Sequence, residues 1–232
     1  MPSYTKSLIL CLLLFVFNGC NNKTLELEKK EPIKTKFVEL KTKSFESENQ
    51  YIILALESEN QKLYFDARNL YFKLFEKTDN YEYFVKYLAI STHIQDYKIV
   101  KEHALKYYKN NIKEEEIILR LYTFALFKLG NQKEALLNAQ KLANLFKSDV
   151  NYELLGTIYL QQKDYLKAYE FFEKAFVLNK SANTFLNLTN IQYFNLSQKT
   201  EAINKIEQYI KDNGHDFNLS IQLLTFYEKE QQ

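Results

Sequence analysis

The sequence predicts an all-α fold of short helices joined by polar links. Only 4 Gly and 2 Pro occur in 232 residues, too few for the many tight turns of an all-β protein. Apolar residues make up 46% of the chain and charged residues 26%, an ordinary globular balance. Small and aromatic residues also recur at intervals of about 34 residues, which predicts that the helices form a repeating array.

The first twenty residues predict an export signal. Lys6 precedes an unbroken apolar run, LILCLLLFVF, from Leu8 to Phe17. A helix that spans a bilayer needs about 20 apolar residues, so this run is too short and instead fits the core of a secretory signal peptide. The run ends in FNGC and is followed by the polar residues NNK.

This junction resembles the lipobox of bacterial lipoproteins, in which a small residue precedes the cysteine that receives lipid. Gly19 and Cys20 fit that pattern, whereas Phe17 and Asn18 depart from the usual leucine and small residue. The resemblance implies a signal peptide at 1–19 and a mature N-terminal cysteine that carries palmitate. An ordinary cleaved signal and an uncleaved anchor are the alternatives.

Residues 20–45 predict a charged tether between that lipid and a globular domain at 46–232. The segment contains Pro32 and alternating charges, and its apolar residues show little pattern. A strand or helix docked on the domain is the alternative. Because Cys11 would leave with the signal and Cys20 would carry lipid, we expect no disulfide in the mature chain.

The segment 151–176, NYELLGTIYLQQKDYLKAYEFFEKAF, places very small residues beside very large ones. Its residues spaced as W-x2-L-G-x2-Y and then A-x3-F, with Tyr in place of Trp, are Tyr152, Leu155, Gly156, Tyr159, Ala168 and Phe172. This stretch resembles a tetratricopeptide repeat, a helix–turn–helix unit of about 34 residues. The family's late proline is missing, and Lys180 stands in its place.

The motif recurs along the chain. The pivotal residue of the second helix falls at Ala67, Val100, Ala135, Ala168 and Ala202. The matching first-helix pairs are Tyr51/Leu54, Phe84/Tyr87, Leu119/Tyr122, Tyr152/Leu155 and Leu186/Thr189. We therefore expect about five repeats between 48 and 216 and a closing helix over 217–230. The resemblance implies a right-handed α-solenoid of about five such repeats with a C-terminal capping helix.

Packing explains the mixture of sizes. Helices of this length are marginal alone, so each must bury an apolar stripe against its neighbours. Where two helices cross closely only a small residue fits, and Gly156 and Ala168 are predicted at such a crossing. In the closing helix the residues expected to face inward are Phe217, Ile221, Leu224 and Tyr227, with 228–232 facing water.

Catalytic and metal-binding motifs are absent from the sequence. The histidines His93, His103 and His215 form no close ligand pair, and no phosphate-binding loop, dinucleotide motif or nucleophile elbow occurs. The acidic run 114–116 is interpreted as a match to a helix N-terminal dipole rather than a cation site. We expect no enzyme, no metal, no cofactor and no small-molecule substrate. The alternative is an envelope enzyme, or its regulatory subunit, with an unrecognised site.

The charge of the chain also limits the class of partner that it can bind. The net charge is +2 without a basic block, so we expect no nucleic-acid partner. Tetratricopeptide proteins generally bind proteins on the concave surface lined by their first helices. Carried over by position, that resemblance assigns the partner-binding groove to Lys86, Arg120, Phe124, Phe127, Lys128, Leu160, Asn187, Ile191 and Phe194.

The expected groove has an apolar centre around Phe124, Phe127 and Leu160. The two-carboxylate clamp of chaperone-binding members is absent, because Ile52 and Leu56 stand at its first positions. An amphipathic helix or an extended apolar segment is therefore the expected ligand. The alternatives are that these aromatic residues pack within the solenoid, or that the tether fills the groove.

The plan of a lipobox followed by five repeats resembles two lipoprotein types. These are the repeat-containing component of the outer-membrane β-barrel assembly machinery and the pilotins that help to assemble pilus secretins. The resemblance implies a membrane-anchored scaffold of the bacterial cell envelope, and it does not select between the two. Asn21 after the cysteine is compatible with export to an outer membrane.

Overall fold

The computed structural model describes residues 45–110 and 115–231. The expected signal peptide, Cys20 and nearly all of the tether lie outside these residues. The described residues form helices and no strand. The helices are α2 (Glu48–Asn60), α3 (Tyr64–Thr78), α4 (Tyr81–His93), α5 (Tyr97–Asn110), α6 (Glu116–Lys128), α7 (Gln132–Leu145), α8 (Asp149–Gln161), α9 (Tyr165–Asn179), α10 (Ala182–Phe194), α11 (Lys199–Asn213) and α12 (Phe217–Glu230).

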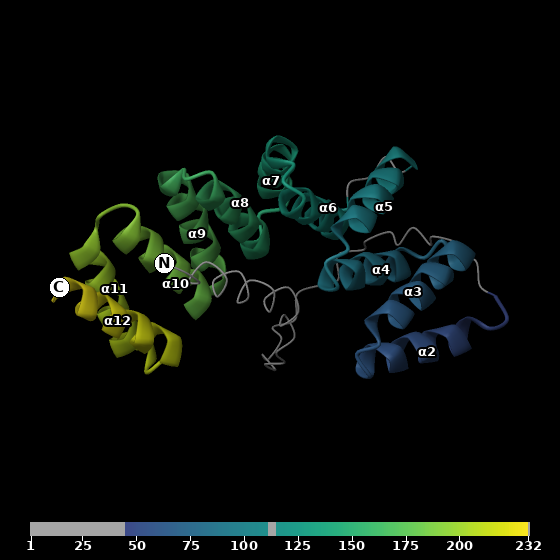
Figure 1. Cartoon of the computed structure of the whole chain (residues 1–232), viewed down its shortest axis with the longest axis horizontal. Coiled ribbons are helices and arrows are strands. Elements are labelled where there is room, and N and C mark those ends of the chain that lie inside the picture. The colour runs from purple at the N-terminus through teal and green to yellow at the C-terminus, as the bar shows by residue number, and fades with distance from the viewer. Residues whose placement is uncertain (1–44, 111–114, 232) are drawn as a thin grey trace, which may run out of the picture. The chain divides into compact units, whose positions relative to one another are not determined.

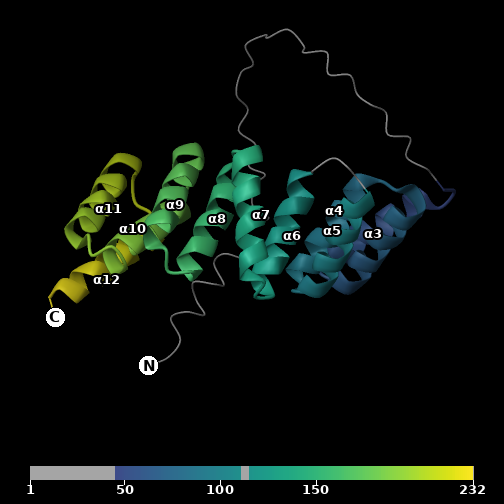
Figure 2. The same cartoon turned by 90° about the horizontal axis from the view of Figure 1, so that it is seen from above.

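This order confirms the predicted all-α solenoid, with repeats from residue 48 and a closing helix at 217–230. The chain divides into two compact units between Tyr83 and Phe84, within α4. The first unit holds the hairpin of α2 and α3. The second holds the hairpins α6/α7, α8/α9 and α10/α11, preceded by most of α4 with α5 and followed by α12 (Figures 1 and 2).

The predicted helix crossings are confirmed. All five pivotal residues are fully buried: Ala67, Val100, Ala135, Ala168 and Ala202. Gly156 of α8 lies against α9, where an added Cβ would be 3.1 Å from Cδ2 of Phe172 and 3.3 Å from the backbone oxygen of Ala168. The smallest residue therefore lies beside one of the largest because α8 and α9 approach too closely for a side chain at this point.

The links between the two helices of each hairpin share one backbone conformation. Each contains a residue in the left-handed region: Lys62, Gln95, Gly130, Lys163 and Ser197. After α8, the Lys163 amide donates to the carbonyl oxygen of Leu160 at 3.1 Å, and the Asp164 amide donates to that of Tyr159 at 3.0 Å. These bonds satisfy carbonyl groups at the helix end and turn the chain back along its own hairpin.

In the fifth repeat the predicted alignment of the first helix was wrong by one residue. Its link, 195–198, is one residue longer than the link 162–164 of the fourth repeat. Phe185 and Leu188 are therefore buried where Leu186 and Thr189 had been aligned with Tyr152 and Leu155. In the first repeat Leu54 is 54% exposed, although its counterparts Tyr87, Tyr122 and Leu155 are buried. No described helix precedes α2 to cover it.

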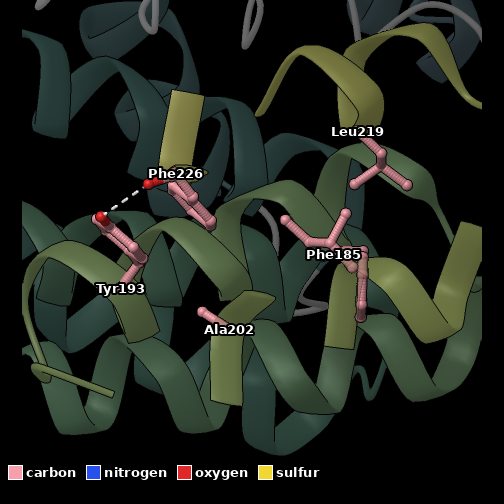
Figure 3. Close-up of a cluster of buried hydrophobic side chains, with 6 residues drawn as sticks. Phe185, Tyr193, Ala202, Leu219 and Phe226 are labelled. Atoms are coloured by element: carbon pink, nitrogen blue, oxygen red, sulfur yellow. Dashed lines mark hydrogen bonds between the residues drawn. The ribbon is translucent and has the colours of Figure 1, made fainter. Parts of the chain in front are cut away.

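The closing helix packs through a different face from the one predicted. Leu219 and Phe226 are fully buried, whereas Phe217, Ile221, Leu224 and Tyr227 are 77%, 48%, 58% and 38% exposed. The prediction of the inward face was wrong because α12 carries two apolar stripes with the same helical spacing. Packing against Phe185, Tyr193 and Ile206 selects the stripe of Leu219 and Phe226 (Figure 3).

Candidate functional site

We call the predicted groove positions on α4, α6, α8 and α10 the first-helix face; all lie in the second unit. Polar residues on this face bond successive repeats to each other. Arg120 of α6 donates to a Glu116 carboxylate oxygen at 3.1 Å and to the Asn151 side-chain oxygen of α8 at 3.3 Å. The same Glu116 oxygen accepts from Asn151 at 2.8 Å and from Ser148 at 3.1 Å.

This network makes Arg120 a structural residue. Asn151 is fully buried, and its amide also donates to the Phe146 carbonyl oxygen at 2.9 Å. Removing Arg120 would leave a partly buried carboxylate without its cation, which is costly inside a protein. Arg120 therefore joins the first helices of the third and fourth repeats, whatever else it binds.

A second polar contact continues between the fourth and fifth repeats. The Thr184 hydroxyl of α10 donates to a carboxylate oxygen of Glu153 on α8. Burial raises the pKa of Glu153, and the hydrogen bond from Thr184 acts in the opposite direction. Glu153 holds the same place in α8 as Arg120 in α6, the fifth residue of the helix. The residue at this fifth position therefore bonds to the next repeat in both α6 and α8.

Aromatic residues of α6 lie between these polar contacts and the end of the helix. Phe124 is half-buried, and its ring meets the edge of Tyr97 with centroids 5.9 Å apart. The ammonium nitrogen of Lys128 lies 5.4 Å from the centre of the Phe124 ring, a cation–π contact. Phe127 and Leu160 are also half-buried. We call Phe124, Phe127 and Lys128 the aromatic centre.

Lys128 has an unusual environment for a surface lysine, because it is partly buried beside an aromatic ring. Burial lowers its pKa, because desolvation disfavours the charged ammonium. Within residues 45–110 and 115–231, no carboxylate forms a salt bridge with it; the Phe124 ring is its neighbour. A carboxylate supplied from outside would therefore gain more from pairing here than with a fully hydrated lysine.

The remaining predicted residues are spread over α4 and α10. Lys86 is exposed on α4, and Asn187 is half-buried on α10. Ile191 is only 2% exposed, so its side chain belongs to the core and cannot meet a partner. The extra residue in the link 195–198 explains this correction, since it moves Leu186 and Asn190 to the places predicted for Asn187 and Ile191.

Phe194 is 49% exposed but contributes to the end of the array. Its ring meets the edge of Tyr193 with centroids 4.8 Å apart and that of Phe226 at 5.6 Å. The ammonium of Lys229 lies 5.7 Å from the ring centre. Phe194 thus helps to seat α12.

Two of the residues that shape the face were not found from the sequence. Asn151 and Thr184 both occupy the third position of a first helix, where α6 has the buried Ile118. No signal in the sequence marked them, because this position also holds Gln50 in α2 and Tyr83 in α4 and because their partners lie more than 30 residues away in the chain. The described residues contain no group of His, Cys, Asp and Glu that could hold a metal ion. They also contain no helix long and apolar enough to cross a membrane.

No protein-family model matches the sequence, and no curated protein matches it. The structure is nevertheless similar to solved repeat proteins. A tetratricopeptide repeat protein from Parabacteroides merdae is 16% identical, with a TM-score of 0.63 over 79% of this chain and 73% of that chain. The structure described as pilF of Pseudomonas aeruginosa is 20% identical, with a TM-score of 0.61 over 80% and 86%.

YrrB, described as a tetratricopeptide protein with an unusual peptide-binding site, is 17% identical, with a TM-score of 0.55 over 75% of this chain and 90% of that one. These likenesses establish the fold. The chain has the fold of a tetratricopeptide-repeat solenoid, as its motif spacing predicted.

Proposed function

We propose that this chain is a scaffold, anchored by lipid in the bacterial cell envelope, which binds a protein partner at the aromatic centre. The observation that carries the binding site is the contrast along α6. Arg120 is hydrogen-bonded within the array, whereas Phe127 and Lys128 lie partly at the surface, and within the described residues Lys128 forms no salt bridge and contacts only the Phe124 ring through its charge. Aromatic residues beside a cation are the kind that dominate binding energy in protein interfaces.

The chemistry of the aromatic centre defines the ligand. Phe124 and Phe127 lie three residues apart on one side of α6 and offer an apolar contact. Lys128 adds a partly desolvated cation. The complementary ligand is a helical or extended segment with an apolar side chain next to a carboxylate. The peptide-binding site described for YrrB supports a peptide ligand on the same fold.

The anchor part of the proposal rests on the sequence. The apolar run from Leu8 to Phe17 and the lipobox-like junction at Cys20 support a lipid-modified N-terminus. The plan of a lipid anchor followed by repeats supports a role in assembling outer-membrane proteins or a pilus secretin. We favour the outer membrane as the membrane in which the lipid anchor inserts.

Partner binding is tested by recovery of a membrane complex with the full chain. In Phe127→Ala and Lys128→Glu we expect partner recovery to fall, with a loss of about 2 kcal/mol in affinity, or about 30-fold, for the aromatic change. Thermal melts should stay near that of the parent, because both side chains are only half-buried.

Arg120→Ala is the contrasting variant. Its melting temperature should fall, because it breaks the bonds to Glu116 and Asn151. Full partner recovery by well-folded Phe127→Ala and Lys128→Glu would refute the aromatic centre as the binding site. Loss of binding only in proportion to unfolded protein would show that the side chains act through stability alone.

The anchor has an independent test. Cys20→Ala should abolish metabolic labelling by palmitate and release the chain from membranes on fractionation. The control is Cys11→Ala, which changes a cysteine within the expected signal and should leave labelling intact. Labelling that persists in Cys20→Ala would refute lipidation at this residue.

A further inference from the structure

The inner face of α12 is held firmly on the preceding hairpin. The Phe226 and Tyr193 rings stack with centroids 3.9 Å apart, and Leu219 and Phe226 are fully buried (Figure 3). The Tyr193 hydroxyl donates to a Glu230 carboxylate oxygen at 2.6 Å, and Lys199 pairs with the same oxygen at 2.8 Å. The orientation of α12 is therefore fixed, and so is the face that it presents outward.

That outer face carries an exposed apolar stripe. Phe217, Ile221 and Leu224 are 77%, 48% and 58% exposed, and their spacing of four and three residues places them on one side of the helix. The residues from 217 to 227, FNLSIQLLTFY, include no charge, although charged residues make up 26% of the chain. A helix face that remains in water is usually charged, so this stripe indicates a surface that becomes covered.

The other repeats show what kind of element covers such a face. Leu224 is the eighth residue of α12, the position of Gly156 in α8, which lies against α9. The eighth residues of the other first helices are all buried: Ala55, Leu88, Thr123 and Thr189. A second helix follows each of those first helices, and no described helix follows α12. The element that fits beside α12 is therefore an antiparallel helix.

We propose that this element is α12 of a second copy of the chain, related by a two-fold axis near Ile221. Antiparallel pairing about that point sets Ile221 against Ile221 of the second copy and Phe217 against its Leu224. The pairing brings no like charges together, because residues 217–227 carry none. The same patch meets itself, as a two-fold interface requires.

The available area points to a weak, closed dimer. The four exposed apolar side chains of α12 offer on the order of 400 Å² per copy, about half of the ~800 Å² that a stable interface buries per partner. A head-to-tail stack is disfavoured because Gln50 and Glu57 of α2 stand at the positions of Leu219 and Phe226. The end of the first unit is thus too polar at these positions to repeat the contact.

The first test measures the mass of the full chain, purified in detergent micelles, by sedimentation with the detergent contribution subtracted. The protein mass should rise from that of one mature chain towards twice that value, with a midpoint on the order of 10 µM. Ile221→Lys places two cations at the axis and should keep the chain monomeric. Leu166→Lys alters a 73% exposed leucine on α9 and should dimerise like the parent. A parent chain that stays monomeric throughout overturns the proposal.

A complementary pair tests the geometry. Phe217→Lys and Leu224→Glu should each be monomeric alone, because each self-pairing buries charges against apolar side chains. Mixed together, one copy of each should form a heterodimer, since the new lysine meets the new glutamate while the other Phe–Leu contact is retained. Failure of the mixture to associate overturns the two-fold pairing. None of these variants touches α6, so partner recovery should be unchanged, which separates this result from the proposed function.

Discussion

Gly156 offers a direct test of how the hairpins pack. A Cβ at this position would lie 3.1 and 3.2 Å from two carbons of the Phe172 ring and 3.3 Å from the Ala168 carbonyl oxygen. Phe172 is buried, so its ring cannot swing into solvent, and the carbonyl belongs to the backbone of α9. Substitutions that only enlarge this residue should therefore destabilise the protein.

The size of the effect follows from two opposing contributions. Alanine in place of glycine within a helix stabilises by about 0.5–1 kcal/mol through backbone entropy. Overpacking a dense core costs about 1–3 kcal/mol. We expect Gly156→Ala to be destabilising by about 1 kcal/mol, because the contacts are tight but need only small shifts. Gly156→Leu adds three more heavy atoms at the same crossing and should cost about 3 kcal/mol or more.

Urea unfolding of the full chain provides the measurement, and Phe172→Leu identifies the cause. This change removes Cε2 of the ring, which the new Cβ would meet at 3.2 Å, and makes the remaining side chain smaller. The double variant Gly156→Ala/Phe172→Leu should therefore lose about 1 kcal/mol less than the sum of the singles. Gly130→Ala is the matched control, because its cost comes from a φ of 79° and nothing lies within 4 Å of its added Cβ. Its effect should be additive with Phe172→Leu. A near-neutral Gly156→Leu would refute the tight crossing.

Two further predictions concern the links and the end of the array. Lys163 has a φ of 64°, so Lys163→Gly should stabilise by up to about 1 kcal/mol in urea unfolding, and a loss of stability would contradict the strain argument. Burial and the hydrogen bond to Glu230 raise the pKa of Tyr193 from 10.0 to about 12, so folding favours the neutral phenol. Its contribution is complete below about pH 10 and lost as pH rises through about 12, and Tyr193→Phe should lose less stability over that interval than the parent. Equal losses would argue against this assignment.

The local features of the fold were predictable because they depend on residues close in sequence. The recurrence of Ala67, Val100, Ala135, Ala168 and Ala202 located the hairpins, and each of these residues is fully buried. The extra residue in the link 195–198 was not predictable from the pivots, because it changes α10 without moving Ala202 from its spacing. One inserted residue rotates a helix face by about 100°, which is enough to bury Ile191.

The prediction of which face of α12 lies inward failed for a different reason. Two stripes, one with Phe217 and Leu224 and one with Leu219 and Phe226, satisfy the same helical periodicity. Periodicity shows that a helix has an apolar side, but it cannot rank two such sides. Tyr193 decides between them by stacking on Phe226, and it lies more than 30 residues earlier in the chain.

The polar contacts of the first-helix face explain how binding and folding can be separated in this array. In the third and fourth repeats the fifth residue of the first helix bonds to the third residue of the next first helix, as Arg120 does with Asn151 and Glu153 with Thr184. These bonds use side chains that would otherwise point at a ligand, so they fix the spacing of the repeats rather than recognise a partner. Phe127 and Lys128 lie two turns further along α6, beyond these contacts. Recognition can therefore change at the end of α6 while the bonds at its start keep the third and fourth repeats in place.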